Sequence, residues 1–273
     1  MREYVVAILG ATGAVGQRLI SELEQSSIPV KKLKLLASKR SAGKKLKFKN
    51  QEITVEEAQP DSFNGVDLVL SSAGGAVSKK LLPEAVKRGA VCVDNTSAYR
   101  MEDGVPLVVP GVNDKELANH HGIIANPNCS TIQMVAALYP IYQRWGIKQI
   151  IVSTYQAVSG AGKAAWDEML NQAHARLNHQ DLKAEILPTA ADKRHYPMAF
   201  NLLPQIDVFE DDGYTHEEWK MIHETKKILL NDQNAGEIKV TATCVRVPIE
   251  IGHGETVYFV VKDSSATTAE IQE

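Results

Sequence analysis

The sequence predicts an α/β protein in which a Rossmann-like, doubly wound parallel sheet is followed by a second α+β domain. Residues 4–9 form a continuous apolar run, which is typical of a parallel strand covered on both faces. A glycine turn follows directly, and further apolar strands alternate with helical segments up to residue 125. With 273 residues and 44% hydrophobic content, the chain is long enough for two domains. We expect domains of residues 1–127 and 128–273.

Composition and charge argue against several classes of protein. A formal net charge of −3 leaves no basic footprint for nucleic acid, and no apolar run reaches the roughly 18 residues that span a bilayer. The three cysteines, without C-x-x-C spacing, suit a reducing cytoplasm better than a disulfide framework. The first strand lies too close to Met1 for a signal peptide, and His216 and His223 lack the spacing of a zinc helix. We expect a cytoplasmic protein that binds no metal, nucleic acid or membrane.

The glycine turn after the first strand predicts a dinucleotide site. It reads G-A-T-G-A-V-G over residues 10–16 and leads into a helix from about Gln17 to Gln25. Glycines let the backbone approach a pyrophosphate, and the helix N-terminus attracts it. The spacing is G-x-x-G-x-x-G, so a tight turn without ligand is the alternative. The residues expected to contact the cofactor here are Gly10, Thr12, Gly13, Ala14 and Val15.

The end of the second strand indicates which cofactor is bound. NAD sites usually place Asp or Glu here, whereas this chain has Ser38-Lys39-Arg40-Ser41, whose hydroxyls and cations suit the 2′-phosphate of NADP. We assign Ser38, Arg40 and Ser41 to the contact, and Lys39 to a solvated loop. The strand that starts at Asp67 opens into small residues at the same edge of the sheet, and its expected cofactor contacts are Ser72, Ala73 and Gly74.

The segment of residues 126–134, N-P-N-C-S-T-I-Q-M, predicts a nucleophile. Pro127 favours an extended residue before it, Asn128 or Ser130 can cap a helix, and apolar residues then follow with helical spacing. Cys129 therefore stands at a helix N-terminus, where the macrodipole favours the reactive thiolate. The strand of residues 123–125 would deliver this thiol to the nicotinamide end of the crevice. A small apolar filler is the alternative reading of Cys129.

Polar residues at strand ends in the second half are further candidates. Gln156 ends a strand and could orient a reacting group or satisfy buried backbone. Arg246 lies on a core-facing strand position and needs a carboxylate from protein or substrate. His253, between two glycines, is accessible and suited to acid–base work. Arg100, also after a strand, is either an anion clamp or a surface arginine.

A helix is predicted to begin at Thr215, with Glu218 as its capping-box partner. Glu217 and Lys220 are three residues apart on this helix and therefore share a face. From spacing alone, a surface ion pair is the default interpretation of these two residues.

Several of these segments together resemble the NADP-dependent bacterial aspartate-semialdehyde dehydrogenases, over essentially the whole chain. The resemblance rests on G-A-T-G-A-V-G at Gly10, S-A-G-K at Ser41, D-N-T-S at Asp94, P-N-C-S-T-I-Q-M at Pro127, S-T-Y-Q-A-V-S-G-A-G at Ser153, E-I-L-P at Glu185, and C-V-R-V-P with G-H between Cys244 and His253. The cysteine and glutamine segments are far more specific than the glycine turn.

The resemblance implies reduction of β-aspartyl phosphate by NADPH to aspartate β-semialdehyde and phosphate, on the way to lysine, threonine and methionine. It also implies a homodimer, with residues 1–127 binding NADP and residues 128–273 carrying catalysis and dimerisation. The implied catalytic residues are Cys129 as the thioester-forming nucleophile, His253 for proton management and Gln156 for positioning. The implied substrate contacts are Arg246 for the α-carboxylate, Glu217 for the amino group, and Arg100, Asn128 and Lys220 for phosphate; Gly160 joins the cofactor contacts.

Two alternatives and one departure accompany this interpretation. N-acetylglutamyl-phosphate reductase has similar chemistry, but its acetylated substrate offers no charge for Glu217. A non-catalytic nucleotide-binding module is the other alternative. Family members continue past the last residues of this chain, so we expect a C-terminally incomplete second domain, less stable than an extended chain in a thermal melt.

Overall fold

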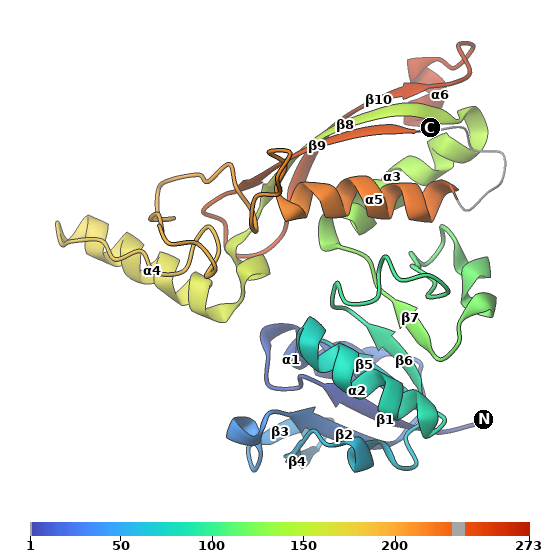
Figure 1. The fold of residues 1–273 in the computed structure, drawn as a ribbon, viewed down its shortest axis with the longest axis vertical. Helices are drawn as coiled ribbons and strands as arrows, with labels where there is room; N and C mark the ends of the chain where they lie inside the picture. The colour runs from blue at the N-terminus through green and yellow to red at the C-terminus, as the bar shows by residue number, and fades with distance from the viewer. Residues whose placement is uncertain (1, 231–237) are drawn as a thin grey trace. The chain divides into compact units, whose positions relative to one another are not determined.

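The computed structural model describes residues 2–230 and 238–273. The chain forms two compact units, Met1–Pro127 and Asn128–Glu273, and each unit is described by itself below (Figure 1).

The first unit contains a sheet whose described strands follow the order β3-β4-β2-β1-β5-β6-β7. The strands are β1 (Tyr4–Leu9), β2 (Val30–Ala37), β3 (Lys45–Phe48), β4 (Gln51–Glu57), β5 (Leu68–Ser71), β6 (Val91–Asp94) and β7 (Ile123–Ala125). All neighbours are parallel except β3 and β4, which form an antiparallel hairpin. The chain runs outward from β1 in both directions, so the carboxyl ends of β1 and β5 flank a switch point, where doubly wound sheets bind ligands.

Strand β1 is buried on both faces, as its unbroken apolar sequence predicts. Val6 and Ile8 belong to one core cluster, which includes Ile20 of helix α1 (Ala14–Gln25). Ala7 and Leu9 belong to the other, together with residues of helix α2 (Gly75–Lys87). Burial at roughly 25 cal/mol per Å² on each face fixes the strand and the turn that follows it.

The apolar sequence of residues 107–109, followed by a turn up to residue 113, predicts a further strand. Among the described residues, however, only Leu107 makes an isolated bridge, to Ala125. Pro106 and Pro110 flank this stretch and have no N–H to donate to a ladder, which explains why the pairing stops. The turn is followed by a 3₁₀ helix, Asp114–Asn119.

The second unit contains a sheet of described strands in the order β10-β8-β9. These are β8 (Ile147–Gln156), β9 (Lys239–Arg246) and β10 (Gly254–Val261), and the helices are α3 (Cys129–Trp145), α4 (Lys163–Leu177), α5 (His216–Leu230) and α6 (Thr268–Gln272). Helix α3 packs against β8, β10 and α5, and α5 packs against β9, so both helices cover the same face (Figure 1).

Strand β8 alternates between the two faces of this sheet, as its sequence predicts. Ile150, Val152, Thr154 and Gln156 are buried, whereas the residues between them are exposed or half-buried. The register places Gln156 beside Arg246 on β9. The buried side chains of Gln156 and Arg246 therefore lie on the sheet face that helices α3 and α5 cover, and Gln156 donates to Glu217 at the start of α5.

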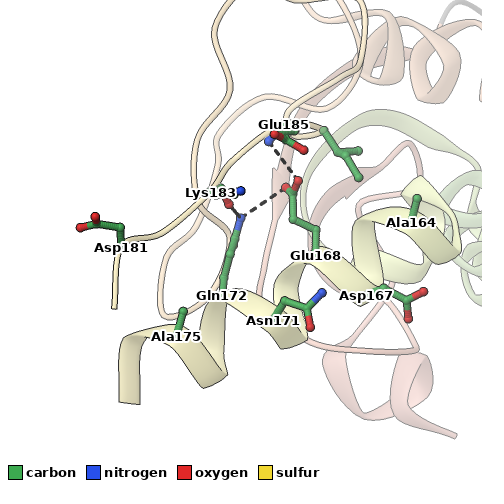
Figure 2. Close-up of a pocket in the computed structure, with 10 residues that line it drawn as sticks. Ala164, Asp167, Glu168, Asn171, Gln172, Ala175, Asp181, Lys183 and Glu185 are labelled. Carbon is green, nitrogen blue, oxygen red and sulfur yellow. Dashed lines mark hydrogen bonds between the residues drawn. The ribbon is translucent and has the colours of Figure 1, made fainter. Parts of the chain in front are cut away.

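Helix α4 is joined by hydrogen bonds to the segment that follows it. Gln172 donates to the carbonyl of Lys183 and, at 3.3 Å, to Glu168. Glu168 also accepts the backbone N–H of Glu185 at 2.9 Å (Figure 2). These bonds line a hollow of about 390 Å³, whose polar atoms serve to hold the loop against the helix.

Candidate active site

Helix α3 presents Cys129 at its first position. Asn128 is the N-cap, and its Oδ1 accepts the backbone N–H groups of Ser130 at 2.9 Å and Thr131 at 3.3 Å. The Cys129 side chain is exposed between buried neighbours. An exposed thiol at a capped helix N-terminus is the environment that favours thiolate, so the interpretation of Cys129 as an apolar filler is wrong.

The other two cysteines, Cys92 and Cys244, are buried, and their pKa values are raised. Burial, with a smaller effect of Asp94, raises the pKa of Cys92 to about 12. Burial also raises the pKa of Cys244 to about 12, against a hydrogen bond with Thr154. Both thiols are therefore inert at neutral pH, and the three cysteines are separated by environment.

Glu217 connects the start of helix α3 to the sheet. Its Oε1 accepts Nδ2 of Asn128 at 2.8 Å and Nε2 of Gln156 at 3.2 Å, and its Oε2 accepts Nζ of Lys220 at 3.1 Å. Burial opposes ionisation, but the Lys220 charge and these hydrogen bonds outweigh it, so the pKa of Glu217 lies below its ordinary value. Glu217 is thus a buried carboxylate in a network, and the default reading of a surface ion pair is wrong.

Lys220 lies between two carboxylates. Its Nζ donates to Asp207 at 3.0 Å as well as to Glu217. Burial lowers the pKa of Lys220, but Glu217 and Asp207 outweigh burial and raise it overall. An ammonium group has three donors, and the described residues accept two of them, so one donor remains for a ligand.

Arg246 and His253 meet around Ala157. Arg246, 5% exposed, donates Nη1 to the Ala157 carbonyl at 2.8 Å, and its buried Nε has no partner among the described residues. The Ala157 N–H donates to Nδ1 of His253 at 3.0 Å. Burial, followed by the charge of Arg246, lowers the pKa of His253. A Cβ placed on Gly160 would lie 3.0 Å from Nη1 of Arg246 and 3.6 Å from Nε2 of His253.

Burial also lowers the pKa of Arg246, while Glu217 and then Cys129 oppose this electrostatically. The Arg246 guanidinium is therefore in electrostatic range of the Cys129 thiol, the His253 imidazole and the Glu217 carboxylate within the second unit. Among the described residues no carboxylate forms an ion pair with Arg246, whose Nη1 donates to the Ala157 carbonyl, although its buried strand position requires such a partner. A carboxylate from a substrate would fill that role.

The first unit contains a cleft of about 630 Å³ at the carboxyl ends of its central strands. Gly10 has φ +91°, and a Cβ there would lie 2.8 Å from the carbonyl of Ser72, so only glycine fits. Gly13 is the N-cap of α1 and makes no side-chain cap, which leaves the first turn's N–H groups available to an anion. These features fit the pyrophosphate of a dinucleotide.

Some of the predicted cofactor residues line the cleft of the first unit, and others do not. Those that line the cleft are Gly10, Thr12, Gly13, Ser38, Ser72 and Ala73. Its lining does not include Ala14, Val15, Arg40, Ser41 or Gly74 among the described residues. Ser41 is buried and accepts from Thr12 Oγ1 at 3.3 Å, whereas Lys39, which we had assigned to a solvated loop, does line the cleft. Gly160 lies in the second unit, beside Arg246 and His253.

Arg100 belongs to the first unit. It is 8% exposed and donates Nε to the carbonyl of Asn126 at 2.9 Å and Nη2 to that of Asn95 at 3.0 Å. The alternative of a surface arginine is therefore wrong.

Sequence reasoning missed two carboxylates of the site. Glu224 accepts the backbone N–H of Asn128 at 2.6 Å, and Asp207 pairs with Lys220. A signal for Glu224 existed, because it follows Glu217 by seven residues, or two turns, on one face of α5. Asp207 lies in an irregular segment, where no periodicity could identify it.

The described residues contain no group of three or more His, Cys, Asp and Glu side chains placed to hold a metal ion. None of the described helices has the length and apolar character that crossing a membrane requires.

Comparisons with known proteins agree on one family. Residues 5–120 match the family model "Semialdehyde dehydrogenase, NAD binding domain", and residues 138–273 match "Semialdehyde dehydrogenase, dimerisation domain". The chain is 56% identical over 267 residues to aspartate-semialdehyde dehydrogenase of Bacillus subtilis (strain 168), covering 98% of this chain and 76% of that one.

Solved structures give the same result. Aspartate semialdehyde dehydrogenase II from Vibrio cholerae, complexed with ASA, matches with a TM-score of 0.92 and 43% identity, covering 100% of this chain and 78% of that one. Aspartate semialdehyde dehydrogenase with NADP from Candida albicans matches with a TM-score of 0.69 and 29% identity, covering 98% and 74%. The chain therefore belongs to the aspartate-semialdehyde dehydrogenase family.

Proposed function

We propose that the chain reduces L-aspartyl 4-phosphate to L-aspartate 4-semialdehyde and phosphate with NADPH, through a thioester on Cys129. The observation that carries this proposal is the network around Glu217, which joins the nucleophile's helix cap to Gln156 and Lys220. A buried carboxylate and the buried guanidinium of Arg246 stand on the same helix-covered face as an exposed thiol. This pair of opposite charges suits the ammonium and carboxylate of a free amino acid.

The first covalent step is thioester formation. The Cys129 thiolate attacks the acyl carbon and forms a C–S bond, and the C–O bond to phosphate breaks, so that phosphate leaves with the electron pair and takes up one proton. Arg246 holds the α-carboxylate through Nε, Glu217 holds the ammonium group, and Gln156 orients the acyl group. Fixed anchors at both ends of the substrate hold the acyl carbon in reach of sulfur.

His253 stabilises the oxyanion in this step. Because Nδ1 accepts the N–H of Ala157, the neutral ring carries its proton on Nε2 and presents it as a donor. Donors fixed before the reaction cost no reorganisation when negative charge develops. Proton management by His253 thus takes the form of holding one proton at Nε2.

Reduction returns the enzyme to its starting state. NADPH, when bound, supplies the hydride that brings the thioester carbon to the aldehyde level. The C–S bond then breaks and the electron pair returns to Cys129 as thiolate, for which the helix N-terminus is again the stabilising environment.

Phosphate is held by donors that the protein leaves unused. Lys220 keeps one N–H after its bonds to Asp207 and Glu217. Asn128 keeps one Nδ2 hydrogen after its bond to Glu217. Lys220 supplies a positive charge and both groups supply N–H donors for a dianion, and we propose Arg100 of the first unit as a further phosphate contact.

NADP is the cofactor, and the cleft of the first unit holds it. Gly10 and Gly13 face the pyrophosphate, and Ser38 and Lys39 face the 2′-phosphate. The partner is a second copy of the chain, since residues 138–273 match the dimerisation domain. The face of the β10-β8-β9 sheet that carries the exposed side chains of Ile151, Tyr155 and Tyr258 suits that contact. We assign the enzyme to the cytoplasm, where buried Cys92 and Cys244 remain thiols.

The test is reduction of NADP with aspartate semialdehyde, with and without phosphate. We expect turnover that requires phosphate and is lost in Cys129→Ala but retained in the matched control Cys244→Ala. N-acetylglutamate semialdehyde should be inactive, because its acetylated nitrogen has no charge for Glu217. Activity on the acetylated substrate alone, or full activity of Cys129→Ala, would refute the proposal.

A further inference from the structure

We infer that Glu224 is a positioning residue for the nucleophile, acting through the backbone N–H of Asn128. This inference rests on the proposed role of Cys129. It concerns a carboxylate that the reaction itself does not require.

Glu224 is one of the most buried charged residues of the second unit. Its side chain is 1% exposed, and its Oε2 accepts the N–H of Asn128 at 2.6 Å. A carboxylate that accepts a backbone N–H forms a charge-assisted hydrogen bond, which is shorter and stronger than a neutral one. The bond joins α5 to the start of α3 across 96 residues of sequence.

Asn128 is held at both its backbone and its side chain by the same helix. Glu224 accepts its N–H, and Glu217, two turns earlier on α5, accepts its Nδ2 at 2.8 Å. Asn128 in turn caps α3 through Oδ1. These bonds fix both the backbone N–H and the side-chain amide of Asn128. They therefore also fix its backbone conformation, φ −60° and ψ 143°, and the direction in which α3 begins.

The position of Cys129 depends on this clamp. Without an acceptor at position 224, the buried N–H of Asn128 would be unsatisfied, which is costly and is relieved by rotation of the residue. Rotation would move Oδ1 away from Ser130 and Thr131 and weaken the cap. The thiolate would then lose part of the stabilisation that the ordered helix terminus gives it.

Alkylation of Cys129 by iodoacetamide tests this without substrate or cofactor. The rate is followed across pH by mass spectrometry of the peptide that contains Cys129, in the full chain. For Glu224→Met, of similar size but without an acceptor, we expect alkylation at pH 7 to slow by about tenfold and its pH midpoint to rise. Glu224→Gln keeps an acceptor oxygen and should remain within about threefold of wild type.

Glu218→Met is the matched control. Glu218 lies on the same helix, is also buried, and accepts the N–H groups of Thr215 and Cys244 instead of that of Asn128. It should lower the melting temperature but leave the pH midpoint of Cys129 alkylation at its wild-type value. If Glu224→Met does not fold, Glu224→Asp, whose carboxylate is one methylene short, should shift the midpoint in the same direction.

The outcomes separate this inference from the proposed function. A wild-type midpoint in both Glu224→Met and Glu224→Asp, or an equal shift in Glu218→Met, would overturn the positioning role alone. Alkylation of wild-type Cys129 as slow as that of Cys92 and Cys244 would contradict the proposed function, and this inference with it.

Discussion

The backbone N–H of Ala157 donates to Nδ1 of His253 at 3.0 Å. A neutral imidazole has one N–H, so this bond assigns the proton to Nε2, beside Gly160. A second proton on Nδ1 would displace the bond to Ala157. Burial and the charge of Arg246 oppose this proton and outweigh the backbone of Gly252 and the charge of Glu217, which favour it, so the pKa of His253 is lowered. The imidazole is therefore a hydrogen-bond donor over the neutral pH range, with its state set by the backbone.

The pH titration of His253 follows from this arrangement. Because its pKa lies below the ordinary 6.5, we expect the ring to remain neutral at pH 6.5 and to protonate only at lower pH. Arg246→Met removes one cause and should raise the titration midpoint. The measurement is NMR of the ring C–H signals, with His253→Gln for assignment. A midpoint at or above 6.5 in the wild type would contradict the donor role.

Gly160→Ala should raise the KM for the aldehyde substrate. The added Cβ would lie 3.0 Å from Nη1 of Arg246, closer than ordinary packing allows, so the guanidinium must shift from its bond to Ala157. We expect KM to rise by about tenfold, as when one charged hydrogen bond is misaligned. Gly162→Ala provides a control, since nothing lies within 4 Å of its Cβ, although its φ of +92° predicts some loss of stability. An unchanged KM in Gly160→Ala would place Arg246 outside the substrate site.

Glu255→Gln should change how stability depends on pH. Burial raises the pKa of Glu255 to about 7 from an ordinary 4.5, against a hydrogen bond from Gln133, and its Oε1 has no partner among the described residues. Between these pH values the folded state binds more protons than the unfolded state, so wild-type stability falls as pH rises from 4.5 to 7.

The glutamine variant cannot ionise and should not show this slope. Relative to wild type, it should gain on the order of 1 kcal/mol between pH 5 and pH 8, after allowance for solvent screening of this half-buried group. Urea unfolding at the two pH values measures the difference. A relative loss of stability at pH 8 would show that the carboxylate is stabilised when charged.

Lys39 and Arg40 should differ in their contribution to cofactor choice. Lys39 lines the cleft of the first unit, whereas Arg40 is not among the described residues that line it. We expect Lys39→Ala to weaken NADP binding by about tenfold, since one charged phosphate contact is lost, and to leave NAD binding unchanged. Arg40→Ala is the matched comparison, and it should weaken NADP binding less than Lys39→Ala does. Isothermal titration with both cofactors gives the answer, and an equal loss for NADP and NAD would exclude contact with the 2′-phosphate.

The sequence was most informative where local patterns decide structure. The apolar run at residues 4–9, the glycine turn and the capped start of α3 each depend on neighbours in sequence, and the structure has all three. The capping box at Thr215 and Glu218 is confirmed as well, with bonds of 2.7 and 3.4 Å.

Long-range partners could not be predicted in this way. Asn128 is bonded to Glu224 and Glu217, 96 and 89 residues away, and no periodicity in one helix names its partner in another. The same reason explains why Glu217 and Lys220 looked like a solvated pair: spacing shows that they share a face, but only tertiary packing shows that the face is buried.

Formation of the acyl-enzyme tests the central claim most directly. Wild-type protein is mixed with aspartate semialdehyde and NADP in the absence of phosphate, and NADPH absorbance and intact mass are recorded over the first turnover. We predict a burst of about one NADPH per chain and an aspartyl adduct on the peptide containing Cys129, as expected when acylation precedes a blocked second step. Absence of the burst, or an adduct on any other residue, would contradict the account.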